Sequence, residues 1–486
     1  MTQKLKKLAI SLLAAIFFFA CSEDKYMGDY EYLNSDTEIS VALNEETFVS
    51  LEQATAVAEK FFGVEAAKKG SAKSLVNASV EAVIDKGNTS MYVVNYPEGG
   101  WVIVGASKNY YPILAYSDEG RFELKADDEM GGVIVWLQET QVAVRESATF
   151  ADSTKTQMRR LWQAYEKKAE SSGAKSQQDM DDRIRSLNRT YGSSGWHFSS
   201  LYDAQWDLDS YSYQEILNMS YNYGYPQYTI VGLKSPSTGP LMTTQWHQAY
   251  PFNAHVVEYE VTNTLAGCGP VAMAQIMKYH GKPTGLTPSV FPDYTHYSWF
   301  DSIGWSNVFN WSNMPNHASQ TTSSNSTHYL IHAAGRAASA SYSTVFTGVN
   351  INNVEYALKN VFGYLSVTKA THTSGSISTI KSSIISLGKP VYMQGVCSIN
   401  GGHAWVCDGV KEYNTLWCAE FYDGNGGYND YNWRTPNYPG SNGYTAYYLH
   451  MNWCFDYYYD AWYINNNVNP GGSNYQNDRE NLYIYY

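Results

Sequence analysis

The spacing of apolar residues predicts a small α+β unit in the first third of the chain. From Glu45 to Phe62 apolar residues recur at helical intervals, which indicates an amphipathic helix. The stretches 90–96 and 99–105 read as two strands joined by a turn, and 112–116 is consistent with a third. From about residue 131 to residue 171 the pattern becomes helical and charged. The order of these elements predicts helices packed beside a short sheet.

The segment from Leu265 to Pro283 predicts a helix buried on nearly all sides. Pro270 suits the first helical position, Gly281 suits the position just past the end, and Pro283 prevents continuation. Apolar residues fill most of the interior, which is typical of a helix without a solvent face. Cys268 therefore lies at or just before the positive end of the helix, where a thiolate is favoured and the cysteine pKa falls. A lone cysteine is more often a small buried hydrophobic residue, so this position makes Cys268 a candidate nucleophile.

His403 is the histidine best placed to partner Cys268. A thiolate nucleophile needs an imidazole that pairs with it and later protonates the leaving amine. Residues 390–409 read as a β-hairpin, and His403 begins its second strand. The stretch 447–453 alternates as a further strand, where Asn452 could accept a hydrogen bond from the His403 ring while Trp453 shields it from water. From this pattern alone, a structural histidine at position 403 stays an alternative.

Together these motifs resemble the streptopain family, which comprises secreted papain-like cysteine proteases made as zymogens. The resemblance rests on the Ala-Gly-Cys helix, the Gly-Gly-His-Ala hairpin, the late His-Met-Asn-Trp strand and an entry segment over 243–253. Residues 80–125 resemble the inhibitory propeptide of that family, and the whole resemblance covers about 40–150 and 238–465. It implies an α+β fold class: a papain-like catalytic domain, with helices packed on a twisted antiparallel sheet, preceded by a small α+β propeptide.

The resemblance also implies a set of site residues. By analogy with the family, Cys268 is the nucleophile, His403 the general base and acid, and Asn452 the residue that orients the imidazole. Gln248 would donate its side-chain amide to the oxyanion, beside the backbone N–H of Cys268. Two further residues are expected to border the substrate: Gly402 and Trp453. The implied reaction is hydrolysis of protein or peptide substrates through an acyl-enzyme, with no metal and no cofactor.

Two departures from the family pattern stand out. The family commonly continues Asn-Trp-Gly-Trp-Gly-Gly, whereas here Cys454 follows Trp453, so the substrate subsites cannot be carried over. About thirty residues, 413–444, are inserted between the His403 strand and the Asn452 strand. The Asp423-Gly-Asn-Gly-Gly run inside this insertion misses the spacing of an EF-hand calcium loop and is expected to be a solvated turn.

The distribution of charge divides the chain into two regions. Residues 1–233 carry 22 basic and 32 acidic side chains, whereas residues 234–486 carry 11 and 14, which suggests different roles. Ser171 to Gln178 has the composition of a solvated linker. We expect these parts: a signal peptide, 1–20; a lipid-anchored propeptide domain with linker, 21–190; a connecting and activation region, 191–237; and a cysteine protease domain, 238–486. Activation by a cut between about Ser171 and Pro240 would release the enzyme from its own propeptide.

The N-terminus predicts export. Three lysines lie within residues 1–7, and a twelve-residue apolar run then ends at Ala20–Cys21, too short to span a bilayer. A cysteine at this place is similar to a bacterial lipoprotein signal, so Cys21 is the expected lipidation site and the membrane a partner; an ordinary cleaved signal is the alternative. The expected location is the outer membrane or cell surface, or the exterior after processing. The net charge of −13 argues against nucleic acid as a partner.

Other histidines and cysteines receive structural interpretations. His328 and His332 are four residues apart on a predicted helix, but no carboxylate ligand or general-base glutamate accompanies them, so we expect core or surface positions rather than a zinc site. A Cys407–Cys418 pair on adjacent strands is possible, although buried free thiols are favoured.

Two rival functions fit part of the sequence. The aromatic content of 15% and the altered loop after Trp453 are compatible with a noncatalytic surface lipoprotein that binds glycan or protein. Acyl transfer to an amine, as in transglutaminases, would use the same cysteine and histidine chemistry.

Overall fold

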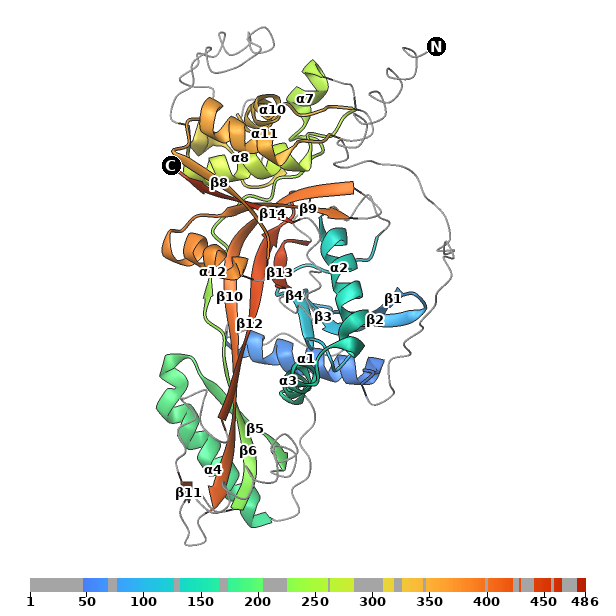
Figure 1. Ribbon diagram of the computed structural model, residues 1–486, viewed down its shortest axis with the longest axis vertical. Helices are drawn as coiled ribbons and strands as arrows, with labels where there is room; N and C mark the ends of the chain where they lie inside the picture. Colours follow the sequence, from blue (N-terminus) through green and yellow to red (C-terminus); the bar gives the residue numbers. More distant parts are fainter. Residues whose placement is uncertain are drawn as a thin grey trace, which may run out of the picture.

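An antiparallel β-sheet runs through the protein and joins its N-terminal and C-terminal parts (Figure 1). The computed structural model describes residues 47–68, 77–125, 132–165, 174–203, 225–260, 263–283, 309–318, 326–343, 347–373, 375–397, 401–422, 428–429, 441–455, 459–465 and 479–486. The predicted signal segment, Cys21 and the turn at Asp423 lie outside these ranges. Among the helices inside them, none combines the length and the apolar character needed to cross a membrane.

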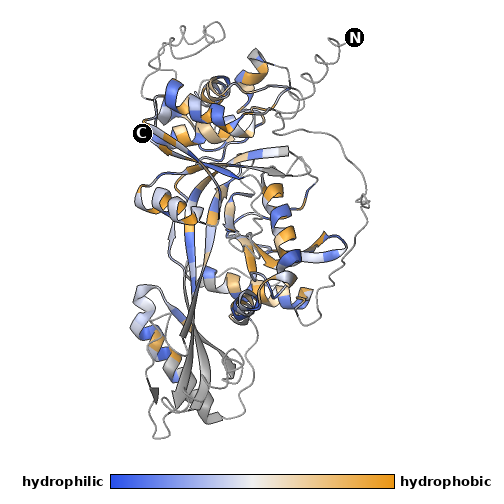
Figure 2. Ribbon diagram, in the orientation of Figure 1, coloured by the Kyte–Doolittle hydropathy of each residue, from blue (hydrophilic) through white to orange (hydrophobic). Residues whose placement is uncertain are grey.

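The N-terminal unit has the helices and strands that the sequence predicts. It consists of α1 (Leu51–Lys68), β1 (Ser79–Asp85), β2 (Asn88–Asn95), β3 (Trp101–Gly105), β4 (Ile113–Ser117), α2 (Val133–Glu146), a 3₁₀ turn (Ser147–Thr149) and α3 (Asp152–Gln163). Helix α1 begins later than expected because Ser50 and Gln53 form a capping box, in which each side chain accepts a hydrogen bond from the other residue's backbone N–H. Figure 2 shows that α2 carries both hydrophobic and hydrophilic residues, as an amphipathic helix on a sheet requires.

The C-terminal unit packs helices on one end of the sheet. In Figure 1, α7, α8, α10 and α11 gather above β8, β9 and β14. Its helices are α7 (Ala254–Tyr259), α8 (Cys268–His280), α10 (Thr327–Ala337), α11 (Ile351–Tyr356), α12 (Ser376–Lys381), a 3₁₀ turn (Trp311–Asn313) and two π-helical turns (Ala357–Val361, Ser382–Ser386). Its strands are β7 (Ser237–Thr238), β8 (Ser366–Thr371), β9 (Val391–Cys397), β10 (Gly401–Tyr422), β11 (Tyr428–Asn429), β12 (Ser441–Asn452), β13 (Ala461–Ile464) and β14 (Glu480–Tyr485). The predicted mixture of helices and antiparallel sheet, preceded by a small α+β unit, is therefore confirmed.

The two units share one sheet and one core. Strand β4 pairs with β13, so that Tyr116 lies opposite Trp462. A single buried cluster combines Phe61 and Trp136 of the N-terminal unit with Tyr448 and other aromatic residues of the C-terminal unit. Two buried ion pairs cross the same boundary: Glu65 with Lys411, and Glu139 with Arg479. The N-terminal unit is thus docked by apolar packing as well as by charge.

A third group of elements surrounds the long hairpin formed by β10 and β12. It comprises α4 (Ala174–Tyr191), a 3₁₀ turn (Gly192–Ser194), β5 (His197–Asp203) and β6 (Tyr225–Lys234). Strand β6 lies between β5 and the outer half of β10, which belongs to the predicted insertion (Figure 1). The expected linker at 171–178 is wrong from Ala174 onward, because α4 begins there and buries Leu187. Within the expected connecting region, β5 and β6 are strands of the sheet.

The expected option of a Cys407–Cys418 disulfide is also wrong. Both cysteines lie on β10, eleven residues apart along one strand. At about 3.3 Å per residue their separation is about 36 Å, whereas a disulfide requires Cα atoms within about 7 Å. Cys268, Cys407 and Cys454 are free thiols, and all three are buried.

Candidate functional site

Cys268 is the first residue of helix α8 and is buried, with 6% of its surface exposed. The preceding Gly267 has φ 90°, and a Cβ atom there would lie 2.7 Å from Cγ2 of Thr347, so only glycine fits this approach to the helix. The Sγ atom of Cys268 accepts a hydrogen bond from the backbone N–H of Ala404 at 3.4 Å. The predicted helix, its end at Gly281 and its burial are all present. The sulfur is thereby fixed against strand β10.

His403 precedes Ala404 on β10, and its imidazole contacts the Cys268 sulfur. Burial lowers the pKa of His403, but the neighbouring Cys268 charge, a hydrogen bond with that sulfur and a hydrogen bond with Trp453 together raise the pKa above its usual value. The ring Nε2–H donates to the backbone carbonyl oxygen of Trp453 at 2.9 Å. Because an imidazole has only two nitrogens, Nδ1 is the one left to face the sulfur. The two residues predicted as nucleophile and base are therefore brought together across 134 intervening residues.

Asn452 does not make the hydrogen bond expected of it. Its Oδ1 accepts from Nε2 of Gln275 at 2.9 Å, and its Nδ2 donates to the backbone carbonyl of Thr244 at 2.8 Å. The ring N–H of His403 is instead held by the next residue, through the main chain of Trp453. Any residue can present a backbone carbonyl, so the motif at 452–453 could not reveal which of the two residues holds the imidazole.

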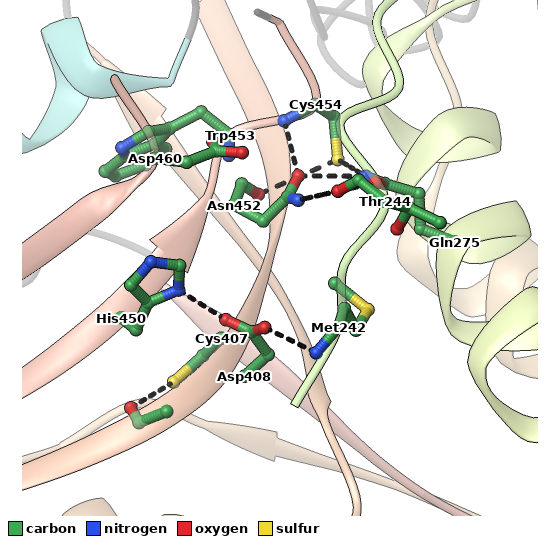
Figure 3. Close-up of polar contacts among 11 residues, drawn as sticks. Met242, Thr244, Gln275, Cys407, Asp408, His450, Asn452, Trp453, Cys454 and Asp460 are labelled. Atoms are coloured by element: carbon green, nitrogen blue, oxygen red, sulfur yellow. Dashed lines mark hydrogen bonds and ion pairs between the residues drawn. The ribbon is translucent and has the colours of Figure 1, made fainter. Parts of the chain in front are cut away.

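Gln248 lies in a segment that is anchored beside the start of α8. Its backbone carbonyl accepts from the N–H of Ala266 at 2.9 Å, two residues before Cys268, and the Gln248 side chain is 8% exposed. The same segment is fixed further upstream, where Met242 N–H donates to Oδ2 of Asp408 at 2.9 Å (Figure 3). The other carboxylate oxygen of Asp408 accepts from His450 at 2.6 Å. This brings Gln248 near Cys268 while its role at an oxyanion stays a prediction.

Trp453 and Gly402 flank the catalytic pair in different ways. Gly402 is buried in β10 opposite Val396, next to His403. The Trp453 indole is fully buried and packs on Trp405 with ring centroids 5.1 Å apart. Both residues therefore lie next to His403, while their role in bordering a substrate stays a prediction.

Gly132 of the N-terminal unit covers this site, which the sequence analysis did not foresee. It is the N-cap of α2, and a Cβ atom at this position would collide with Cδ2 of His403 and lie 2.6 Å from Cε3 of Trp453. The backbone of the N-terminal unit thus rests directly on the His403 imidazole and the Trp453 indole. The only sequence signal was a glycine pair before a predicted helix, which by itself indicates a helix start.

Three other histidines form a buried structural cluster. On α10, His332 hydrogen-bonds to Nδ1 of His255 at 2.8 Å and to Glu260 at 2.8 Å, while His328 stacks near His255. Burial, reinforced by neighbouring histidines, lowers the pKa of His255 to about 2, and burial lowers the pKa of His328 to about 4. Over the described ranges no group of His, Cys, Asp or Glu is arranged to hold a metal ion. The expectation that His328 and His332 belong to the core is confirmed.

Comparison with known proteins finds two family models in this chain. The Peptidase C10 family matches residues 246–463, and the Spi protease inhibitor matches residues 46–144. Streptopain of Streptococcus pyogenes serotype M28 (strain MGAS6180) is 25% identical over 371 residues, which cover 73% of this chain and 77% of that protein. Streptopain of Streptococcus pyogenes serotype M1 gives the same identity and coverage.

Among solved structures, two chains from Prevotella intermedia are similar. A fragment of prointerpain A, with a cysteine replaced by alanine, has 14% identity and a TM-score of 0.46 over 84% of this chain and 99% of that chain. The active wild-type interpain A cysteine protease has 21% identity and a TM-score of 0.35 over 51% of this chain and 96% of that chain.

The contact between Cys268 and His403 predicts a shift that can be measured. In a Cys268→Ala chain the pKa of His403 should fall, because the sulfur that raises it is gone while burial, which lowers it, is unchanged. Titration of the His403 ring by NMR would measure the change. Cys407→Ala, which removes a buried thiol from the same strand, should leave the pKa of His403 as in the parent. An unchanged pKa in Cys268→Ala would contradict the contact.

Proposed function

The chain belongs to the peptidase C10 family, and on that premise we propose that it is an exported endopeptidase in which Cys268 and His403 hydrolyse peptide bonds. It is a cysteine-type peptidase with a Spi-type inhibitor unit ahead of the catalytic region, so the intact chain is a zymogen. The observation that carries the residue assignment is the contact of the Cys268 sulfur with an imidazole whose other nitrogen is held by Trp453. Proteins and peptides are the substrates, and no cofactor is needed.

In the proposed mechanism the Cys268 thiolate attacks the carbonyl carbon of the scissile bond. The imidazolium of His403 then gives its Nδ1 proton to the leaving amine, the C–N bond breaks, and an acyl-enzyme remains. His403, now neutral, takes a proton from water, which attacks the thioester and releases the acid. Throughout this cycle the Trp453 carbonyl keeps Nε2–H in place, which is the orienting role that the sequence motif suggested for Asn452.

An oxyanion site is proposed between the start of α8 and the Gln248 segment. The N-terminus of a helix favours negative charge, so the backbone N–H of Cys268, at the start of α8, would face the developing oxyanion. Gln248 would add its side-chain amide, and the support for this is the hydrogen bond that ties its main chain to Ala266. One such donor typically contributes about 3 kcal/mol to lowering the barrier.

The first test is covalent labelling of the nucleophile. The processed enzyme should react with a thiol-directed epoxide inhibitor at Cys268, and Cys268→Ala should lose the label and at least about a thousandfold in kcat/KM. Peptide mapping by mass spectrometry and a peptide hydrolysis assay give the two readouts. Cys407→Ala is the matched control and should keep both label and activity. Full activity in Cys268→Ala would overturn the assignment.

Latency is proposed to result from the N-terminal unit covering the site. Gly132 rests on His403 and Trp453, and the unit is held in place by the shared sheet and by the buried Glu139–Arg479 and Glu65–Lys411 pairs. A peptide substrate would need the space that Gly132 occupies. The propeptide therefore acts as an inhibitor within its own chain until cleavage allows it to leave.

A larger side chain at position 132 should weaken this inhibition. Gly132→Leu forces atoms into the space of His403 and Trp453. Overpacking of this kind costs about 1–3 kcal/mol, which lowers the docking equilibrium constant about five- to 150-fold. Initial peptidase rates of the intact chain, taken before a gel shows any cleavage, should rise accordingly. Gly192→Leu is the control, because nothing lies within 4 Å of a Cβ at that position. If the intact Gly132→Leu chain had no more peptidase activity than the intact parent, latency would have another origin.

The proposed mature enzyme keeps the elements that the sequence assigned to the linker. Strand β6 pairs along β10, Glu412 N–H donates to the carbonyl of Pro236, and Leu241 N–H donates to that of Asp408. Helix α4 is tied to β5 by Asn188, whose side chain bonds both N–H and C=O of Phe198. Removing α4, β5 and β6 with the propeptide would strip a strand from the catalytic sheet. We therefore place the cut before Ala174 and keep Cys21, as a lipid anchor, with the released propeptide.

Intact-mass measurement of both fragments after self-processing tests this division. The catalytic fragment should begin between residues 166 and 174 and partition into the aqueous phase of a detergent extraction. The propeptide fragment should carry a lipid mass on Cys21 and enter the detergent phase. A catalytic fragment beginning near Pro240 would refute retention of α4 to β6, and an unmodified propeptide would refute the anchor.

A further inference from the structure

Helix α8 carries a second polar side chain on the same face as the nucleophile. Gln275 lies seven residues after Cys268, which is close to two full turns, so the two side chains point the same way about 10 Å apart along the helix. The Gln275 side chain has no exposed surface. A buried primary amide is costly unless its hydrogen bonds are made, so a glutamine in this otherwise apolar helix needs partners.

The partners of Gln275 come from two segments that carry other parts of the site (Figure 3). Its Nε2 donates to Oδ1 of Asn452 at 2.9 Å and to Sγ of Cys454 at 3.2 Å. Its Oε1 accepts from Nδ2 of Asn452 at 3.3 Å and from the backbone N–H of Trp246 at 3.4 Å. Gln275 therefore bonds on one side to the segment that leads to Gln248, and on the other to the residues on both sides of Trp453.

Asn452 extends the same connection. Besides its bonds with Gln275, its Nδ2 donates to the carbonyl of Thr244 at 2.8 Å, and its Oδ1 accepts from the N–H of Cys454 at 3.2 Å. The two amides thus join the nucleophile helix, the entry segment and the end of β12. These three segments carry the Cys268 sulfur, the proposed oxyanion donor Gln248 and the Trp453 carbonyl that accepts from His403.

The peptide after Trp453 needs this support because Cys454 is held in a left-handed conformation. Its φ is 58°, a region that residues other than glycine rarely occupy and that costs energy in their case. Its N–H donates to Oδ1 of Asn452, and its sulfur accepts from Nε2 of Gln275. On the other side, the Trp453 N–H donates to Oδ1 of Asp460 at 2.9 Å. The direction of the Trp453 carbonyl is therefore set by bonds on either side of it.

We propose that Gln275 is a positioning residue, which acts through Asn452 and Cys454 to hold the Trp453 carbonyl on Nε2 of His403. The inference rests on the proposed function, in that it assigns a role in the Cys268–His403 reaction. Gln275 itself touches no reacting atom. Without it, Cys454 can relax, the Trp453 peptide turns, and the imidazolium loses the acceptor that stabilises it.

The test compares processed enzymes that have Gln275→Met, which keeps the volume but removes every hydrogen bond, with the parent. Each full-length chain is cleaved in trans by tagged parent enzyme that is then removed, and rates are divided by the Cys268 titrated with epoxide. Gln275→Met should lower kcat about ten- to a hundredfold and change KM less than twofold. The alkaline limb of kcat/KM should move down by about half to one pH unit, because loss of a hydrogen bond to the imidazolium lowers its pKa.

Two further variants make the outcome decisive. Gln275→Leu also removes every hydrogen bond of the amide and adds no charge, so it should show the same shift of the alkaline limb if the Met variant is recovered poorly. Tyr279→Phe removes a different hydrogen bond of α8, the one to the Gly388 carbonyl, and should behave as the parent. Parental kcat and an unmoved alkaline limb in both Gln275 variants would overturn the positioning role. Failure of Cys268 to take the epoxide would instead refute the proposed function.

Discussion

The contact between the Cys268 sulfur and the His403 imidazole is the interaction on which the rest of the site depends. The sulfur is fixed by the start of a buried helix and by the N–H of Ala404, while the ring is fixed by the Trp453 carbonyl. Each anchor lies on a different segment, so no single element can create the pair. Burial alone would keep the imidazole neutral, whereas the sulfur and the carbonyl together raise its pKa. The charge that the proposed chemistry needs is therefore a property of the assembled site.

Because the Cys268–His403 pair is buried and fixed, an inhibitor must also be held rigidly to cover it, which explains why the inhibitor unit shares the sheet. A loop resting on a buried pair can exclude substrate only if it is held rigidly, and here β4 extends the catalytic sheet beyond β13. Shared aromatic packing and two buried ion pairs add to that hold. Buried charges are costly to separate from their partners, by about 3–5 kcal/mol when one partner is removed. Partial displacement of the N-terminal unit is thus unfavourable. Activation is therefore expected to require cleavage of the chain and release of the whole unit.

Local hydrogen bonds stabilise Cys454, the residue at which the chain departs from the family pattern. Where the family has glycine after Asn-Trp, this chain has Cys454 with a positive φ. The side chains of Asn452 and Gln275 take up its N–H and thiol, so the turn is kept although the residue that usually makes it easy is absent. In the insertion at 413–444, the described part of β10 pairs with β6, and β6 pairs with β5.

The sequence by itself determined the elements with local causes. The end of α8 at Gly281, the hairpin that carries His403 and the strands of the N-terminal unit follow from glycine and hydrophobic periodicity within short windows; α8 itself begins two residues before Pro270, at Cys268. Recurring motifs also singled out Cys268 and His403. Only the tertiary structure decided that the Trp453 carbonyl, rather than Asn452, holds the imidazole, that Gly132 covers it, and that α4 to β6 join a distant hairpin. Main-chain groups are alike at every position, so a local pattern cannot show which carbonyl accepts a hydrogen bond. Contacts between distant segments depend on how the whole chain packs, so a local pattern cannot predict them either.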